Sequence, residues 1–140
     1  VERSRGLGDV YKRQPQMDAV SLHCPKNKET TNMFSENQFK IMKESAFLIN
    51  CSRGGIINEV ALLNALKSNK IRAAGLDVYD DEPSTSSNPL FSLDNILLSP
   101  HIAGVTQEAT IRMSKQAVQN VLDVFDDKVD PEVIINKKVL

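Results

Sequence analysis

Arg53 lies in a turn whose composition suits the binding of a carboxylate. The turn is the run 50–55, Asn-Cys-Ser-Arg-Gly-Gly, which follows an apolar, strand-like segment. Adjacent glycines let the backbone approach a ligand closely, and a guanidinium holds a carboxylate through two parallel hydrogen bonds. In the alternative interpretation the arginine only caps the C-terminus of a neighbouring helix. The run predicts an anion site.

Glu82 and His101 indicate a second chemistry, the transfer of a proton. His101 follows a short apolar run and is one of two histidines in the chain. An imidazole takes up and returns a proton near neutral pH, and a carboxylate beside it favours its charged form. Glu82 stands directly before Pro83, which narrows its backbone range. The alternatives are a histidine packed at a strand end and a solvated loop acid.

Metal and nucleophilic chemistry fit the chain less well. The two separated histidines and two cysteines show none of the close ligand spacings of zinc sites. Ser52 has no base beside it in sequence, which disfavours a serine nucleophile. His23, in the run Leu-His-Cys-Pro at 22–25, has no acid close behind it, so we expect it to line a pocket. We expect no metal site.

Composition excludes several classes of partner. The chain has 140 residues, of which 41% are hydrophobic, and a formal net charge of -1. A chain of this size buries roughly two thirds of its unfolded surface, enough for one compact core but not for two full domains. Its balanced charges give no footprint for nucleic acid or an anionic membrane, and no apolar run approaches the length of a membrane span. Cys24 and Cys51 read as free thiols in a reducing compartment, which predicts a cytoplasmic protein.

The elements that must position these residues alternate along the chain as in βα units, which predicts an α/β fold with a parallel sheet. Expected strands are Asp18–His23, Ala46–Asn50, Ala73–Asp77 and Ile96–Leu98, and expected helices are Ser35–Met42, Glu59–Ser68 and Thr106–Phe125. Val60, Leu63 and Leu66 are spaced for one buried stripe of the second helix. Residues 80–87 read as a loop.

The candidate side chains share one feature of position, since each falls at or just beyond the end of an expected strand. Ligands of open parallel sheets bind outside the carboxyl ends of the strands. This places His23, Asn50, Arg53, Asp77, Glu82 and His101 at a common edge. The agreement in position predicts a small-molecule site there.

Residues 1–17 do not fit the α/β pattern. Their apolar residues follow neither the spacing of a helix nor that of a strand, and charged side chains are frequent. We therefore interpret them as a non-native or disordered extension. Gly6 and Gly8 lack the preceding strand, the third glycine and the following helix of a dinucleotide fingerprint. We therefore expect no phosphate-binding loop in residues 1–17.

Four ordered motifs closely resemble the D-isomer-specific 2-hydroxyacid dehydrogenase family over about residues 18–136. The motifs are the runs 22–25 Leu-His-Cys-Pro, 47–55 Phe-Leu-Ile-Asn-Cys-Ser-Arg-Gly-Gly, 75–83 Gly-Leu-Asp-Val-Tyr-Asp-Asp-Glu-Pro and 99–104 Ser-Pro-His-Ile-Ala-Gly. The resemblance implies a Rossmann-like sheet. Residues 18–108 would form the C-terminal part of an NAD-binding domain, and residues 109–140 a helix returning to the substrate domain with a remnant of that domain. By the same resemblance this chain lacks the first half of the cofactor domain, with its glycine fingerprint, and would be inactive alone.

The resemblance also implies site residues and a reaction. Arg53 would orient a small 2-oxo or 2-hydroxy acid, His101 would transfer the proton, and Glu82 would pair with His101. NAD, with NADP left open, would contact His23, Pro25, Cys51, Ser52, Arg53, Asp77, His101 and Gly104. The full-length protein would be a homodimer. The alternatives are a non-catalytic, NAD-sensing interaction protein similar to a corepressor, and a truncated, inactive protein.

Overall fold

The structure is a computed structural model that describes residues 14–136 of the 140-residue chain. Two compact units make up the chain, one ending at Ala103 and one beginning at Gly104. Most of the extension expected at residues 1–17 lies outside the described residues. Within it, Gln14–Gln16 form a 3-10 turn, η1, in which the Gln14 side chain is buried.

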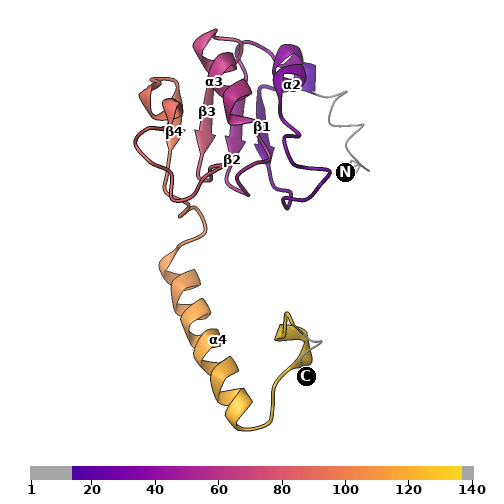
Figure 1. Ribbon diagram of the computed structural model, residues 1–140, viewed down its shortest axis with the longest axis vertical. Helices are drawn as coiled ribbons and strands as arrows, with labels where there is room; N and C mark the ends of the chain where they lie inside the picture. Colours follow the sequence, from indigo (N-terminus) through magenta and orange to yellow (C-terminus); the bar gives the residue numbers. More distant parts are fainter. Residues whose placement is uncertain (1–13, 137–140) are drawn as a thin grey trace. The chain divides into compact units, whose positions relative to one another are not determined.

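The first unit is built on a parallel four-stranded sheet, which confirms the α/β fold expected from the sequence. The strands are β1 (Ala19–Leu22), β2 (Phe47–Asn50), β3 (Ala73–Leu76) and β4 (Ile96–Leu98), in the order β1-β2-β3-β4. In Figure 1 all four arrows point the same way. Because parallel strands end at one edge, the segments that follow them converge there.

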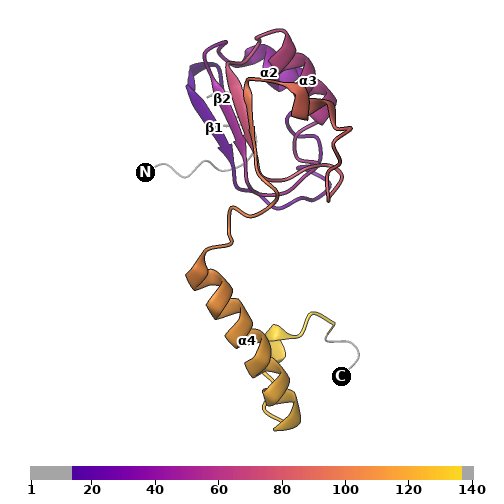
Figure 2. The same ribbon diagram turned by 90° about the vertical axis from the view of Figure 1, so that its left-hand side faces the viewer.

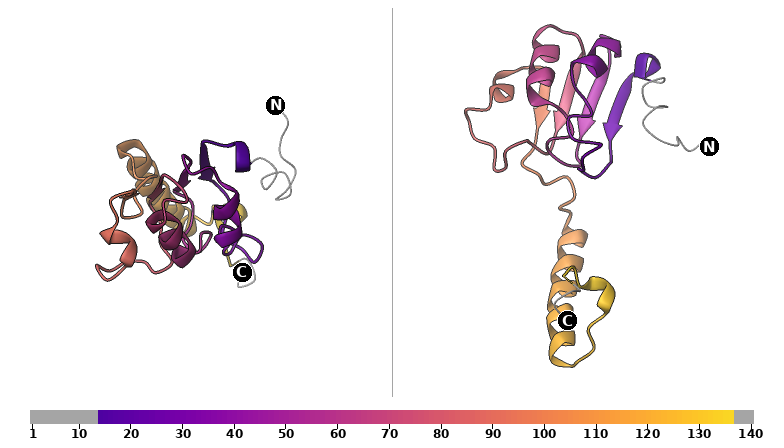
Figure 3. Two further views of the ribbon diagram at one scale, coloured as in Figure 1. Left: turned by 90° about the horizontal axis from the view of Figure 1, so that it is seen from above. Right: turned by 45° about the vertical axis from the view of Figure 1, so that its right-hand side comes forward.

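Two helices cover one face of this sheet. They are α2 (Glu36–Ile41) and α3 (Glu59–Lys67), and Figures 2 and 3 show both on the same side of the strands. The core between these helices and the sheet holds buried side chains, among them Phe34, Phe39, Leu48, Leu62 and Leu66. Side chains on the other face are far more exposed, 42% for Phe47 and 78% for Leu97. The described part of the unit thus has one packed face.

Helix α3 begins at Glu59, a short way beyond the glycine-rich turn 50–55. Asn58 is its N-cap, and the Asn58 side chain accepts the backbone N–H of Ala61 at 2.8 Å. Of the stripe predicted for this helix, Leu66 is buried and Leu63 is half-buried against the core, but the prediction is wrong for Val60, which is 66% exposed. The buried side chains of the helix are Ala61, Leu62, Ala65 and Leu66.

The second unit contains α4 (Gln107–Phe125), the longest helix of the described chain, and a 3-10 turn, η3 (Pro131–Val133). Thr106 caps α4 by accepting the N–H of Ala109 at 3.1 Å. None of its side chains is buried, and apolar residues such as Val118 and Phe125 stay exposed. Among residues 14–136 there is no helix with the length and apolar character needed to cross a membrane.

Candidate active site

The side chains selected from the sequence gather at the carboxyl edge of the sheet in the first unit. His23 and Pro25 follow β1, Ser52 and Arg53 follow β2, Asp77 follows β3, and His101 comes three residues after β4. Glu82 lies farther along the loop after β3, which the 3-10 turn η2 (Pro89–Ser92) ends. The sheet brings these groups to one edge, and the loops decide which of them meet.

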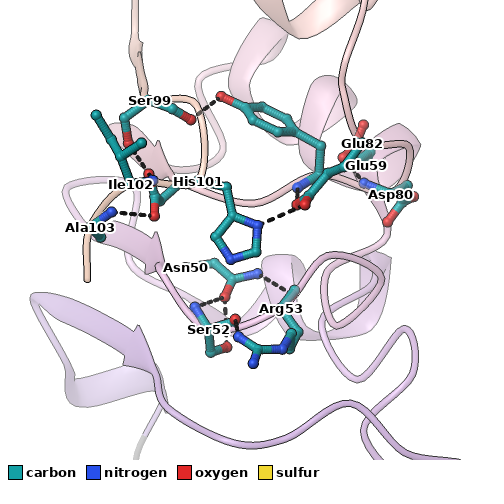
Figure 4. A network of polar contacts seen from close by, with 12 residues as sticks. Asn50, Ser52, Arg53, Glu59, Asp80, Glu82, Ser99, His101, Ile102 and Ala103 are labelled. Atoms are coloured by element: carbon teal, nitrogen blue, oxygen red, sulfur yellow. Dashed lines mark hydrogen bonds and ion pairs between the residues drawn. The ribbon is translucent and has the colours of Figure 1, made fainter. Parts of the chain in front are cut away.

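His101 and Glu82 form the closest pair of ionisable groups at this edge. His101 Nδ1 lies 2.7 Å from Glu82 Oε2, and Figure 4 shows the ring turned toward the carboxylate. The other oxygen, Glu82 Oε1, accepts the backbone N–H of Tyr79 at 2.9 Å. The Tyr79 N–H, and after it the hydrogen bond to His101, lower the pKa of Glu82. The carboxylate is therefore held in its charged form beside the ring.

The backbone of His101 is fixed by Asp77, the residue after β3. His101 has a positive φ of 56°, which is costly for a residue with a side chain. Asp77 stabilises this turn because its carboxylate accepts the next two backbone N–H groups, from Ile102 at 2.9 Å and Ala103 at 2.8 Å. Ser99 donates its hydroxyl to the same carboxylate.

Asp77 is only 2% exposed, and its ionised state depends on these hydrogen bonds. Burial acts to raise its pKa, but the hydrogen bonds from Ser99, Ala103 and Ile102 together outweigh it, so the pKa lies below the ordinary value. The predicted contact of Asp77 with a cofactor stays a prediction. In the described structure its oxygens are engaged in holding the turn that carries His101.

Arg53 has a fixed backbone and a side chain without an acidic partner among the described residues. Its carbonyl accepts the Asn50 side-chain amide at 2.9 Å, and Asn50 Oδ1 accepts both the N–H and the hydroxyl of Ser52. The guanidinium is exposed and donates to the carbonyl of Ser52 at 2.6 Å. Its remaining donors are available to a ligand (Figure 4).

Gly54 lets the turn that carries Arg53 touch the loop that carries Glu82. A Cβ atom at Gly54 would overlap the carbonyl oxygen of Tyr79, so the two backbones are in direct contact. Gly55 has a positive φ of 76°, and its N–H acts on the Asp80 carboxylate. Burial raises the pKa of Asp80, against the lowering effects of that N–H and of Lys26.

Two of the cavities at this edge border Arg53. One, of about 340 Å³, brings Arg53 and the His101–Glu82 pair together; its lining is Lys26, Arg53, Gly54, Tyr79, Asp80, Glu82 and His101. The other, of about 380 Å³, is lined by His23, Cys24, Pro25, Lys26, Ser52 and Arg53. Arg53 and Lys26 border both cavities, so two cations stand between them. Their side chains suit an anionic ligand.

The second cavity collects part of the predicted cofactor set. His23, Pro25, Ser52 and Arg53 line it, whereas Cys51 is exposed and is not among its lining residues. His23 also shares a hydrogen bond of 2.8 Å with the hydroxyl of Ser21. Gly104 opens the second unit and is described with it. The cofactor contacts of Cys51, Asp77 and Gly104 stay predictions.

Sequence reasoning missed Lys26, Tyr79 and Glu59. Lys26 directly follows Pro25 of the first motif, and its charge beside a glycine-rich turn was a usable signal. Tyr79 donates its backbone N–H to Glu82. Because every residue except proline has this donor, the type of residue at position 79 gives no signal for the contact. Glu59 accepts the N–H of Asp80, a contact across 21 positions of sequence.

Comparison with protein families places the chain among dehydrogenases. Residues 6–103 match the model of the D-isomer specific 2-hydroxyacid dehydrogenase, NAD binding domain. A glyoxylate reductase of Thermofilum pendens is 42% identical over 123 residues, which cover 88% of this chain and 36% of the relative. A D-3-phosphoglycerate dehydrogenase of Archaeoglobus fulgidus is 39% identical over 76% of this chain and 20% of its own length. The chain thus spans little more than a third of these relatives at most.

Solved structures also match most of this chain and less than half of their own length. The TT0316 protein from Thermus thermophilus gives a TM-score of 0.81 at 34% identity, covering 87% of this chain and 39% of that one. The NAD-complexed D-isomer specific 2-hydroxyacid dehydrogenase from Lactobacillus delbrueckii ssp. bulgaricus gives 0.77 at 32% identity, over 89% of this chain and 42% of that one.

Proposed function

The chain belongs to the D-isomer specific 2-hydroxyacid dehydrogenase family, in its NAD-binding domain, and on this premise we propose that the protein interconverts a small 2-oxo acid and the D-2-hydroxy acid. One observation carries the proposal. A histidine paired with a carboxylate shares a cavity with an arginine that has no acidic partner among the described residues. These are the groups that proton transfer and carboxylate binding require.

Arg53 binds the substrate in this proposal. A guanidinium holds a carboxylate through two parallel N–H donors, and Arg53 uses one donor on the carbonyl of Ser52. The other donors are free to hold the carboxylate and the neighbouring 2-oxo oxygen. Because the Asn50 side chain fixes the Arg53 backbone, substrate binding needs to order only the arginine side chain.

His101 donates the proton. Its Nδ1 is engaged by Glu82, so Nε2 is the nitrogen left to reach the substrate oxygen. NADH, when bound, supplies the hydride to the carbonyl carbon. The proton from Nε2 completes the alcohol, and in the reverse direction the neutral ring accepts it. Glu82 orients the ring through its contact with Nδ1.

The cofactor is proposed to lie over the ends of β1 and β2, where His23, Pro25 and Ser52 line the second cavity. A cofactor held there would adjoin Arg53, which borders both cavities. Lys26 and Arg53 suit its negative charge. The proposed set also includes Cys51, Asp77, His101 and Gly104, and it leaves NADP open as an alternative to NAD.

The substrate, the assembly and the location are proposals as well. Relatives named glyoxylate reductase, D-3-phosphoglycerate dehydrogenase and glyoxylate/hydroxypyruvate reductase B favour glyoxylate, hydroxypyruvate and the phosphorylated hydroxypyruvate as candidates. We propose a homodimer joined through its cofactor domains. The free Cys24 and Cys51 support a reducing, cytoplasmic location.

The variant His101→Asn in the full-length protein tests the proposal. We expect kcat for every accepted 2-oxo acid to fall by about 10²-fold or more, because asparagine cannot supply the proton. NADH binding, measured by fluorescence, should weaken far less than kcat falls. His23→Asn is the matched histidine variant, and it should change the KM for NADH more than kcat. Turnover of His101→Asn near that of the wild type would refute the role of His101.

A further inference from the structure

Glu59 links the two loops that carry the proposed catalytic groups. It is the first residue of α3, directly after the N-cap Asn58, and its side chain is partly buried. Its Oε1 accepts the backbone N–H of Asp80 at 2.7 Å, and its Oε2 accepts the side-chain amide of Asn88 at 3.1 Å. Figure 4 shows Glu59 reaching Asp80 behind Glu82. One side chain thus ties α3 to both ends of the loop after β3.

Glu59 holds the Tyr79–Asp80 segment, which contacts both Glu82 and the turn that carries Arg53. The N–H of Tyr79 donates to Glu82, and the carbonyl of Tyr79 packs against Gly54 beside Arg53. The N–H of Gly55 in turn lowers the pKa of the Asp80 carboxylate. A shift of the Tyr79–Asp80 peptide therefore moves Glu82 and the Arg53 turn together.

A carboxylate suits this position better than an amide. Asn88 Oδ1 already accepts the N–H of Leu90 at 3.0 Å, so the orientation of the Asn88 amide is fixed and its Nδ2 must donate. Asp80 also presents a donor. Glutamine at position 59 would turn an NH2 group toward one of these two donors and lose its hydrogen bond to that donor, although Asn88 Nδ2 would keep a second acceptor in Ser84 Oγ at 3.2 Å.

We propose that Glu59 is a positioning residue, which holds the Tyr79–Asp80 segment so that Arg53 and the His101–Glu82 pair keep a fixed geometry. The inference rests on the proposed function. Glu59 touches neither His101 nor Arg53 through a hydrogen bond or ion pair in the described structure, so its effect on turnover passes through the backbone. Displacement of catalytic groups by about 1 Å can cost on the order of 10²-fold in rate.

The competing explanation is that Glu59 only stabilises α3 by placing a negative charge in its first turn. Helix α2 supplies a matched control, because Glu36 is the first residue after its cap, Ser35, and is exposed. No hydrogen bond or ion pair of the Glu36 side chain is found within residues 14–136. Glu36→Gln removes the same charge from the same helical position without touching the site.

The experiment compares Glu59→Gln with Glu36→Gln in the full-length protein. For Glu59→Gln we expect kcat/KM for the 2-oxo acid to fall by about tenfold, with most of the loss in kcat. Glu36→Gln should match the wild type. Kinetics and a pH profile of Glu59→Gln that equal those of Glu36→Gln, whatever the loss of stability, would overturn the proposal.

The pH profile is the readout that a purely structural role would not move. The Tyr79 N–H is the largest cause of the lowered pKa of Glu82, so loosening Tyr79 should raise that pKa. The acid limb of kcat/KM then moves to higher pH in Glu59→Gln. The other charges acting on Glu82 are His101, which lowers its pKa, and Asp77, which raises it, and both are unchanged in the variant.

Two further arms keep the test decisive. If Glu59→Gln does not fold, Glu59→Asp replaces it in the test. This variant keeps the charge at the start of α3, but its side chain is too short to reach both Asp80 and Asn88, so it should show the same shift of the acid limb. A wild type that reduces no 2-oxo acid refutes the proposed function separately. The titration of Glu82, followed by ¹³C NMR of its carboxyl group, then decides the role of Glu59. A pKa of Glu82 that is equal in Glu59→Gln and Glu36→Gln overturns it.

Discussion

The two halves of the candidate site, the Arg53 turn and the His101–Glu82 pair, differ in how firmly their side chains are held. Around Arg53 the backbone is fixed, by Asn50 and by contact with Tyr79, while the guanidinium stays exposed. Around His101 both the backbone and the ring are fixed, by Asp77 and by Glu82. The difference suggests a division of work, in which the proton-transfer half is organised beforehand and the anion-binding half is ordered by the ligand.

Replacing Gly54 by alanine should have the largest effect, because it breaks the contact between the halves. The new Cβ atom would overlap the Tyr79 carbonyl, so the backbone on one side must move. We expect the free energy of unfolding to fall by about 1–3 kcal/mol, and kcat/KM to fall on the order of 10²-fold. Urea unfolding and steady-state kinetics of the full-length protein measure both.

Gly75→Ala is the matched control for Gly54→Ala. Its Cβ atom would lie 4.0 Å from the Ile49 side chain, an ordinary van der Waals contact. We expect a change in the free energy of unfolding within about 0.5 kcal/mol and unchanged kinetics. Equal effects of the two alanines would contradict the idea that Gly54 couples the halves.

Replacing Asp77 by asparagine tests the organised half alone. Asparagine loses the charge and turns an NH2 group toward one of the backbone donors of Ile102 and Ala103. We expect a loss of about 2–3 kcal/mol in the free energy of unfolding. We also expect kcat to fall by about tenfold while the KM for the 2-oxo acid changes little, since the Arg53 turn is untouched. A rise in KM with unchanged kcat would contradict the comparison.

How far the sequence predicts the fold can be judged from α3 and its neighbours. The four strands were predicted because short apolar runs ended at polar residues, and the structure confirms each within two residues of its predicted ends. The buried face of α3 was predicted correctly for Leu66 but wrongly for Val60, because Ala61 and Ala65 carry little hydrophobic signal and Val60 carries much. The sheet selects which face of a helix is buried, and that choice depends on contacts distant in sequence.

The candidate site shows the same limit. Residue types and the family motifs predicted Arg53, Glu82 and His101, and the resemblance implied the pairing of the last two, which the structure shows at 2.7 Å. The hydrogen bonds of Asp77 to Ile102 and Ala103 were not predicted. They depend on the positive φ of His101, a backbone state that the sequence of the turn does not reveal.

The smallest expected effect is the pH dependence of stability from Glu82, and it sharpens the comparison by isolating one ion pair. The folded-state pKa of Glu82 lies below its ordinary value, so its contribution is present above about pH 4.3 and is lost as the pH falls through the folded pKa. The pair is partly exposed, with 46% of the His101 side chain and 34% of the Glu82 side chain accessible. Solvent screening then limits the contribution to under about 1 kcal/mol.

Glu82→Gln removes this contribution at every pH while leaving Asp77, whose pKa is also lowered, in both proteins. The difference in the free energy of unfolding between wild type and Glu82→Gln should therefore be largest near pH 6 and shrink toward pH 3, as measured by urea unfolding at each pH. A difference that is constant over this range would mean that the charge of Glu82 adds no stability. The stabilising contact would then be the hydrogen bond from the Tyr79 N–H, which a neutral side chain can also accept. In that case the ion pair with His101 would serve orientation alone, and the proton-transfer half would be held by Asp77.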